Sequence, residues 1–302
     1  MENGKTGKYL KYAIGEILLV VIGILIALQV NNWNENKKSE ALNKTLLAKV
    51  QKELIYNIQE LTRVIEFYRS RDTLQTKVLK KQVDINDYKK NPIYFYAIMN
   101  FNIANLSQEA YVELTKNNSK LENKDSTIIS QLKDIYNKDF KNIEMTNNEI
   151  KQIAMNFYNE SRSSKEWHHH FSTKSIPEIL NNKSIMDYYL NDPYYLNNVD
   201  MFQTMATYNL TTMMVIMRSK LIKTCANLSE YLDNDNEALV FNDSKKFKHY
   251  IGTYLSEYDT SYKISDNNGQ LVISFKRAND SVFDSAFNIY PQDETHFTID
   301  FE

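Results

Sequence analysis

The amino-acid sequence predicts a mainly α-helical protein with an N-terminal transmembrane helix, long amphipathic helices that form an extramembrane bundle, and a small C-terminal antiparallel β-domain. Three observations predict this fold class. Residues 17–28 are wholly apolar, and apolar residues then recur at three- and four-residue steps as far as residue 233. Near the end of the chain, the turn sequence Asn267-Asn268-Gly269 separates two segments with the alternation of β-strands.

Composition excludes several classes of function. The chain of 302 residues has only 6 glycines, and none lies between Ile24 and Ile251, so it lacks the clustered glycines of a P-loop, a dinucleotide fingerprint or a Gly-x-Ser-x-Gly elbow. A lone cysteine, Cys225, excludes an internal disulfide framework and a cysteine-rich metal site. The 36 basic and 38 acidic side chains provide no basic face for nucleic acid. We therefore expect no nucleic-acid partner and no cofactor, and we identify no catalytic residue.

Residues 14–33 form the predicted transmembrane helix. With residues 9–12 the apolar segment has about 22 residues, or roughly 33 Å of helix, which is enough to cross a hydrocarbon core of about 30 Å. Tyr9, Tyr12 and Trp33 lie where aromatic belts meet the two membrane surfaces.

Basic residues predict the orientation of this helix. Lys5, Lys8 and Lys11 precede it and neutral asparagines follow it, so residues 1–13 form a short cytoplasmic tail and the rest lies outside the bacterial inner membrane, in the periplasm. Three lysines further along the chain weaken this asymmetry. A cleaved signal peptide is the alternative, but the apolar run is long and lacks a small-x-small cleavage site. We expect a retained anchor.

One face of the membrane helix carries candidate contact residues. Gly15, Leu19, Gly23 and Ala27 recur every four residues, so three small side chains allow another helix to pack closely in lipid. Glu16 lies beside this face, although an ionisable group costs about 2.5–3.5 kcal/mol at the bilayer centre. Either snorkelling or pairing with a lysine reduces this cost, or Glu16 is functional. Expected partners are membrane lipid and either a second copy or another membrane protein.

The stretch from Lys8 to Glu35, KYLKYAIGEILLVVIGILIALQVNNWNE, resembles the N-terminal signature of an uncharacterised family of single-pass membrane proteins from Gram-negative bacteria. Members of this family are similar in having a long helix after the membrane segment, matched here by residues 52–58. A further helical region has an Ala-Tyr-x-x-Leu sequence, matched by Ala110, Tyr111 and Leu114. The resemblance implies a membrane topology and no reaction.

The helical bundle is predicted over residues 34–233. Its first amphipathic helix spans residues 34–81 and is long enough for coiled-coil packing. The apolar stripe of this helix comprises Leu47, Val50, Leu54, Leu61, Val64 or Ile65, and Tyr68. Turn-forming residues at 84–92 end it, an aromatic helix follows at 93–105, and a short helix follows at 108–116.

A second long helix begins at Asp125 or Ser126, either of which can cap it. Its stripe comprises Ile129, Leu132, Tyr136, Ile143, Ile150, Ile153 and Phe157. A polar break is predicted over residues 161–171. Ser175 with Pro177 and Glu178 then has the pattern of a helix N-terminus, and this helix continues to about Leu190.

The last long helix is predicted from Val199 to Asp233. Its stripe comprises Ala206, Leu210, Met213, Met217, Leu221, Cys225, Leu228 and Leu232. Its methionines are Met201, Met205, Met213, Met214 and Met217. Methionine at helical spacing more often fills gaps in a core than lines an adaptable binding groove, so we expect a core role.

A linker at residues 233–237 precedes a predicted β-module at 238–302. Its predicted strands cover residues 262–264, 271–275, 287–290 and 296–301. The segment from Phe247 to Phe301 resembles a small accessory β-module that is often appended to bacterial serine-hydrolase and peptidase-like proteins.

His168, His169 and His170 form the one cluster with metal-ligand chemistry. Consecutive helical residues point about 100° apart and adjacent strand residues point to opposite faces, so three in a row rarely chelate one ion. We expect a solvated loop and only a weak metal-site candidate.

Two functions fit these observations. The first is a membrane-anchored interaction or scaffold protein, with a sensor-like component as a variant. The alternative is a membrane-anchored hydrolase-related enzyme, or an accessory subunit of one, which only the likeness of the β-module suggests. No Ser/His/Asp arrangement can be assigned.

Overall fold

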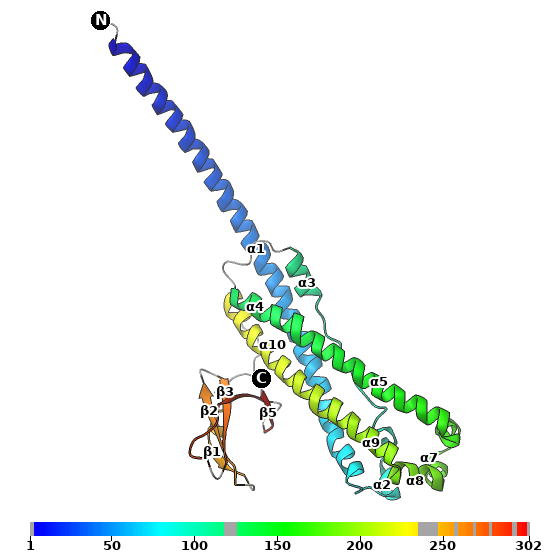
Figure 1. Cartoon of the computed structure of the whole chain (residues 1–302). Helices are drawn as coiled ribbons and strands as arrows, with labels where there is room; N and C mark the ends of the chain where they lie inside the picture. Colours follow the sequence, from blue (N-terminus) through cyan, green and yellow to red (C-terminus); the bar gives the residue numbers. More distant parts are fainter. Residues whose placement is uncertain are drawn as a thin grey trace.

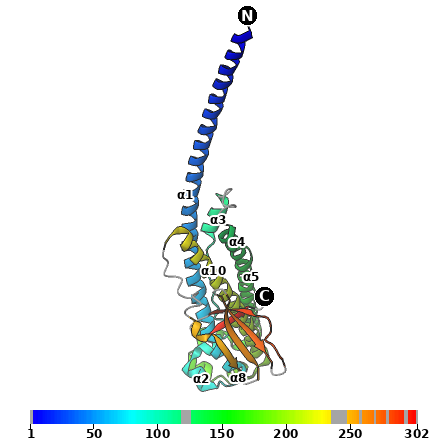
Figure 2. The ribbon, with the colours of Figure 1, turned by 90° about the vertical axis from the view of Figure 1, so that its left-hand side faces the viewer.

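A computed structural model describes residues 3–117, 126–234, 247–256, 259–267, 270–277, 280–291 and 295–300. One long helix extends beyond a bundle of helices, and a small antiparallel sheet lies against one side of that bundle (Figures 1 and 2). This architecture confirms the predicted fold class.

Helix α1 (Asn3–Leu79) is one unbroken helix of 77 residues, or about 115 Å at 1.5 Å per residue. The predicted transmembrane helix and the first amphipathic helix are therefore continuous. No glycine or proline lies between residues 24 and 91, so nothing in this sequence interrupts the helix. Lys81 ends it with a φ of 52°, and hydrogen bonds from Lys81 N to Val78 O and from Gln82 N to Lys77 O close a Schellman motif.

The other helical segments follow α1 in the chain, and all but the last of them, whose Tyr250 packs against the core of the β-module, lie around the C-terminal half of α1. They are α2 (Ile85–Lys90), η1 (Pro92–Tyr96), α3 (Glu109–Lys116), α4 (Ser126–Asp134), η3 (Ile135–Asp139), α5 (Phe140–Ser164), η4 (Glu166–His169), α6 (His170–Thr173), α7 (Ile176–Leu180), α8 (Lys183–Asn191), α9 (Pro193–Phe202), η5 (Gln203–Leu210), α10 (Thr211–Leu232) and η7 (Lys248–Tyr250). Segments η3 and η5 are π-helical, so α4–η3–α5 and α9–η5–α10 each form one long rod. Helix α10 packs along α1.

Several predicted boundaries were wrong. The predicted break at 84–92 contains helix α2, because the Asp84 side chain accepts hydrogen bonds from Asn86 N and Asp87 N and thereby caps a new helix. Only Pro92–Tyr96 of the predicted helix 93–105 is helical, as a 3₁₀ segment. Residues 100–107 carry no helix or strand.

The predicted polar break at 161–171 is largely helical, because α5 continues to Ser164 and η4 and α6 follow it. The helix that was predicted up to Leu190 divides into α7 and α8, since the Asn182 side chain caps a new helix by accepting from Ser184 N and Ile185 N. Its predicted start is confirmed, with Glu178 Oε2 2.9 Å from Ser175 N. The last rod begins at Pro193, earlier than predicted, because Asp192 caps α9.

The predicted apolar stripes form one buried cluster at the centre of the bundle. Every predicted residue of the α1 stripe is buried. The methionines of the last rod differ in burial. Met214 and Met217 are fully buried, whereas Met201 is 53% exposed and Met213 is 37% exposed. The predicted core role is thus wrong for Met201 and Met213. A 3.6-residue period places only part of each turn against the core.

Aromatic side chains fill the end of the bundle that lies away from the N-terminus. Tyr88 lies 4.7 Å from Phe95 between ring centroids, and Tyr189 lies 4.8 Å from Tyr195. Tyr88 donates a hydrogen bond to Tyr189 O at 3.2 Å. These tyrosines are buried, so they belong to the core and not to a ligand site.

The β-module is a five-stranded meander in the order β1-β2-β3-β4-β5. Its strands are β1 (Gly252–Leu255), β2 (Ser261–Asn267), β3 (Gln270–Lys276), β4 (Phe287–Pro291) and β5 (Phe297–Asp300). The predicted hairpin is confirmed by the pairing of Asn267 with Gln270, although residues 268–269 lie outside the described residues. Strand β1 was not predicted, because Gly-Thr-Tyr-Leu is short and shows no regular alternation of apolar and polar residues.

The module has its own small core, separate from the core of the bundle, formed by Phe247, Leu271, Ile273 and Ile289. Strands β4 and β5 contact α10, and an Arg69 Nη2–His296 Nδ1 contact of 3.0 Å joins α1 to the module. Asp233 ends α10 with a φ of 52°, and most of the predicted linker lies outside the described residues.

Candidate functional site

The apolar part of α1 has no covering element among the described residues. Side chains from Ile14 to Val30 are exposed, and Leu19 is 72% exposed. By length and composition this helix could cross a membrane. An exposed apolar surface of this extent calls for a lipid or protein cover.

The candidate contact residues Gly15, Glu16, Gly23 and Ala27 all lie on this bare part of α1. A methyl group added at Gly15 or at Gly23 would meet no atom within 4 Å among the described residues. The face is therefore free to receive another helix, and the predicted contact stays a prediction.

A polar stalk, residues 31–45, joins the apolar part of α1 to the bundle. Its side chains are mostly exposed, and the buried core begins at Leu46. At 1.5 Å per residue the stalk is about 22 Å long. Lys37 Nζ lies 5.2 Å from the centroid of the Trp33 ring, a cation–π contact at the end nearest the apolar segment.

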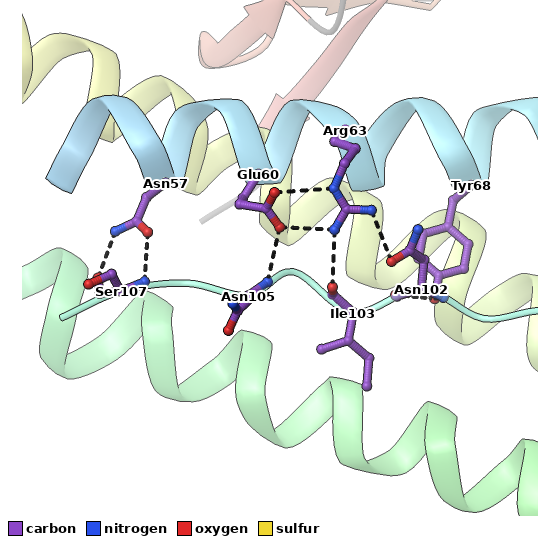
Figure 3. Close-up of polar contacts among 8 residues, drawn as sticks. All are labelled: Asn57, Glu60, Arg63, Tyr68, Asn102, Ile103, Asn105 and Ser107. Carbon is purple, nitrogen blue, oxygen red and sulfur yellow. Dashed lines mark hydrogen bonds and ion pairs between the residues drawn. The ribbon is translucent and has the colours of Figure 1, made fainter. Parts of the chain in front are cut away.

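A network of polar side chains on α1 holds an extended segment, residues 102–107, which we name the strap (Figure 3). Tyr68 Oη donates to Asn102 O at 2.8 Å and accepts from Asn102 N at 3.1 Å. At the other end, Asn57 Nδ2 donates to Ser107 O at 2.8 Å and Asn57 Oδ1 accepts from Ser107 N at 2.8 Å. Side chains thus supply hydrogen bonds that a neighbouring strand would otherwise provide.

An ion pair forms the middle of this network. Glu60 Oε2 lies 2.9 Å from Arg63 Nη2 and accepts from Asn105 N at 3.3 Å, while Arg63 Nη1 donates to Asn102 Oδ1 at 3.1 Å (Figure 3). The hydrogen bond from Arg63 lowers the pKa of Glu60, and the backbone N–H of Asn105 adds to this effect. Burial raises the pKa of Tyr68 to about 12.

Glu53 joins the strap to two further helical segments. Its carboxylate accepts from Ser107 Oγ at 2.8 Å, from Ala110 N at 2.8 Å and from Tyr111 N at 3.2 Å. Gln108 at the start of α3 makes no capping bond with its own side chain, so Glu53 caps this helix from α1. Tyr136 Oη from η3 also donates to Glu53 at 2.7 Å, and burial, together with the charge of Glu53, raises the pKa of this tyrosine.

Sequence reasoning missed this network, because Asn57, Glu60 and Arg63 were part of the charged background of an amphipathic helix. One signal was available. Glu53, Asn57, Glu60 and Arg63 recur at three- and four-residue steps and form a polar stripe beside the apolar one. These side chains hold the backbone of the strap in place and cap α3, so the role of the network is structural.

The histidines of the triplet have three different partners. His168 Nδ1 lies 3.2 Å from Ser161 Oγ, and His169 Nδ1 lies 2.9 Å from Glu166 O. His170 Nδ1 lies 3.5 Å from Asn182 Nδ2. Burial lowers the pKa of His168, and the charge of Arg162 adds to this effect.

The three rings therefore point to separate partners, and the expected loop is instead helical. Among the described residues, no group of three or more His, Cys, Asp or Glu side chains could hold a metal ion.

Residues 16–106 match a family of unknown function (DUF6090). The match begins in the apolar part of α1 and ends one residue before Ser107, so it contains the stalk and nearly all of the strap. It supports the prediction of an uncharacterised domain. Comparison with curated proteins finds no match, and comparison with solved structures finds none. The N-terminal signature and the likeness of the β-module to hydrolase-associated modules stay predictions.

Proposed function

We propose that this protein is a single-pass membrane-anchored interaction or scaffold component, with a sensor-like role as a variant. In this proposal residues 1–13 lie in the cytoplasm, and the bundle and the β-module lie on the periplasmic side of the bacterial inner membrane. Lys5, Lys8 and Lys11 support this orientation because they precede the apolar run.

The continuity of α1 is the observation that carries the proposal. The same helix supplies the exposed apolar segment, the polar stalk and the buried stripe of the bundle from Leu46 onward. The strap and the N-terminus of α3 are fastened to this helix by Asn57 and Glu53. Because α1 continues from the proposed membrane segment into the bundle, the bundle is held at a fixed distance from the membrane and in a fixed orientation. Such an arrangement suits the presentation of a binding surface.

We also propose that a second copy or another membrane protein packs on the face of Gly15, Gly23 and Ala27, beside Glu16. Support comes from the spacing of the small residues and from the open space around both glycines. Lipid covers the remaining apolar surface.

Paired reporter fusions test the topology. Alkaline phosphatase, whose disulfides form only outside the cytoplasm, should be active when fused after Glu302, and green fluorescent protein at the same position should be dark. Green fluorescent protein fused before Met1 is the matched control and should fluoresce in the membrane fraction. The reverse pattern at Glu302 would overturn the orientation, and release of the N-terminal reporter from the rest of the chain would indicate a cleaved signal peptide.

A further inference from the structure

Strand β1 forms one edge of the five-stranded sheet, and this edge is open to solvent. On its inner side β1 pairs with β2, whereas β4 and β5, at the other end of the sheet, contact α10. Three consecutive residues of β1 are exposed, and among them Leu255 is 69% exposed and Tyr254 is 38% exposed. The outer edge of β1 is therefore accessible to another molecule.

The backbone of β1 directs hydrogen-bonding groups outward at two residues. Ser256 N donates to Thr260 O at 2.9 Å, so the backbone groups of Ser256 face the side of β2. Successive residues of a strand direct their N–H and C=O groups to opposite edges, so Tyr254 also faces β2, whereas Thr253 and Leu255 face outward. These two residues present two N–H donors and two C=O acceptors at the spacing of a β-ladder.

In the described part of the chain, this edge lacks the usual features that block strand pairing. Proline, charged side chains, a β-bulge or a covering helix normally protect an exposed edge strand. The sequence Gly-Thr-Tyr-Leu contains no proline and no charged residue, and the register with β2 runs without a bulge from Gly252↔Ile264 to Leu255↔Ser261. Strand β1 can therefore serve as a template for the addition of a further strand.

The size of the edge indicates which occupant fits. A contact along a strand of four residues is much smaller than the roughly 1,200–2,000 Å² that a stable protein dimer buries. A second copy of the chain would gain too little from this edge alone, whereas a short extended peptide can pair with all of the outward backbone groups. The alternating donors and acceptors select an extended peptide backbone, because no other common ligand has them at this spacing.

Side chains beside the edge add a preference for sequence. Tyr254 and Tyr262 lie opposite each other on one face with stacked rings 6.1 Å apart, so an aromatic residue added opposite Tyr254 continues this row. On the other face, Lys263 lies opposite Thr253, is exposed and makes no ion pair within the described residues. An acidic residue added opposite Thr253 would be two strand spacings, about 10 Å, from Lys263, which the two extended side chains can span.

We propose that the outer edge of β1 binds an extended peptide segment of a partner protein, antiparallel to β1, with an aromatic residue opposite Tyr254 and an acidic residue opposite Thr253. This inference rests on the proposed interaction role, for which it names the kind of partner. Backbone hydrogen bonds with Thr253 and Leu255 supply the affinity, and the alternate side chains supply the selectivity.

A fluorescently labelled peptide, Thr-Ser-Tyr-Glu-Ile-Ser-Asp, is the probe. It copies residues 260–266, most of the strand that already pairs with β1, with glutamate in place of Lys263. In the same antiparallel register, its tyrosine lies opposite Tyr254 and its glutamate opposite Thr253. Fluorescence anisotropy with the full-length protein in detergent should show saturable binding, and the absence of such binding would overturn the proposal.

N-methylated forms of the peptide test the strand pairing. Methylation of the first serine and the glutamate removes the N–H groups that face β1, so it should weaken binding about tenfold or more. Methylation of the tyrosine and the isoleucine, whose N–H groups point away from β1, is the matched control and should change binding by no more than about twofold. Equal effects of the two forms would overturn the proposal.

The charged contact has its own test. A peptide with lysine in place of the glutamate should bind about threefold more weakly, as expected for an exposed ion pair. Lys263→Ala should abolish this difference between the two peptides. A preference for glutamate that persists in Lys263→Ala would overturn the assigned register.

A pair of variants locates the site on β1. Thr253→Pro removes an outward N–H, which an edge strand tolerates, so the sheet should remain folded while peptide binding is lost. Thr253→Val keeps this N–H and should bind like the wild type. Peptide binding that survives in folded Thr253→Pro would overturn the proposal. If this variant does not fold, the two methylated peptides still decide the question on the unaltered protein.

Cross-linking distinguishes a peptide partner from a second copy. The full-length protein in membranes should give the same cross-linked species in Thr253→Pro as in the wild type. A loss of dimers in this variant would assign the edge to a second copy and overturn the proposal. The peptide assay does not depend on the orientation of the chain in a membrane, so its failure is distinct from a failure of the reporter fusions.

Discussion

The carboxylate of Glu53 is buried on α1 and is held by hydroxyl groups and backbone N–H groups. Its position at the N-terminus of α3 is favourable, because the first N–H groups of a helix lack partners within the helix and carry partial positive charge. Tyr136 Oη adds a hydrogen bond from η3 at 2.7 Å. One side chain therefore fixes the mutual positions of α1, the strap, α3 and the rod α4–η3–α5.

Replacing Glu53 tests this role. Glu53→Ala leaves the N–H groups of Ala110 and Tyr111 and the hydroxyl of Tyr136 without their acceptor, so we expect a loss of about 3 kcal/mol in the free energy of unfolding. Glu53→Gln keeps one acceptor oxygen and should lose less. Urea unfolding of the full-length protein in detergent measures both. Glu66→Ala, at an exposed carboxylate on the same helix, should change the free energy by no more than about 0.5 kcal/mol. Equal effects at residues 53 and 66 would contradict the capping role.

Glu60 makes the strap sensitive to acid. Its pKa is lowered in the folded protein by the hydrogen bond from Arg63, so its contribution to stability is present above its ordinary pKa of 4.5 and is lost as the pH falls through the lower folded value. We expect the difference in stability between the wild type and Glu60→Gln to be largest near neutral pH and to shrink below pH 4.5. The pair is partly exposed, so the effect should be small. A difference that grows with acidity would contradict this sign.

At the scale of elements, α1 has three consecutive environments along one helix. Its segment 14–30 exposes apolar side chains, its stalk is polar, and its last part buries one stripe and uses a neighbouring stripe to hold the strap. A helix that is apolar all round suits lipid, whereas an amphipathic helix suits the surface of a core. The change in pattern between Val30 and Leu46 therefore locates the change in environment.

The glycine face of α1 gives a prediction for self-association. Gly23→Ile places a branched side chain where close helix packing is expected, so chemical cross-linking of the protein in membranes should yield fewer dimers. Val21→Ile, which points about 200° away at 100° per residue, is the matched control and should cross-link like the wild type.

Glu16→Gln separates a role of charge from a role of packing. Retention of dimers in Glu16→Gln together with their loss in Gly23→Ile would assign the contact to the small residues. Unchanged cross-linking in Gly23→Ile would rule out the glycine face as the contact.

On the scale of the whole molecule, the unbroken helix sets the distance between its apolar segment, the proposed membrane anchor, and the bundle. The stalk contributes about 22 Å, and the bundle and the β-module lie beyond it (Figure 1). Because no glycine or proline interrupts residues 24–91, the orientation of the bundle should follow that of the apolar segment of α1.

Spin labels test the rigidity of the stalk. Labels on cysteines introduced at Asn34 and Tyr56, both exposed on α1, should give a narrow distance distribution centred near about 33 Å in the full-length protein. The native Cys225 is buried, and burial raises the pKa of its thiol to about 11, so it should remain unlabelled. Insertion of Gly-Pro after Glu40 should broaden the distribution. If the protein without the insertion gives a distribution as broad as that of the insertion variant, the stalk bends.

Features that depend on neighbouring residues could be predicted from the sequence alone. Periodicity of 3.6 residues located the stripe that contains Leu54 and Leu61, and the pattern from Ser175 to Glu178 located the start of α7. The Asn-Asn-Gly turn located the hairpin of β2 and β3. Each of these signals acts within a few residues of the chain.

The strap and the π-helical segments could not be predicted in this way, because they depend on contacts between residues far apart in sequence. Glu53 and Tyr136 are 83 positions apart, and Gln203 reaches Thr76 across 127 positions. The polar stripe of α1 could equally have faced solvent, and nothing local in residues 102–107 indicates which side chains would receive their backbone groups. Burial supplies the physical reason, since a polar group taken out of water must find a partner wherever the fold brings one near.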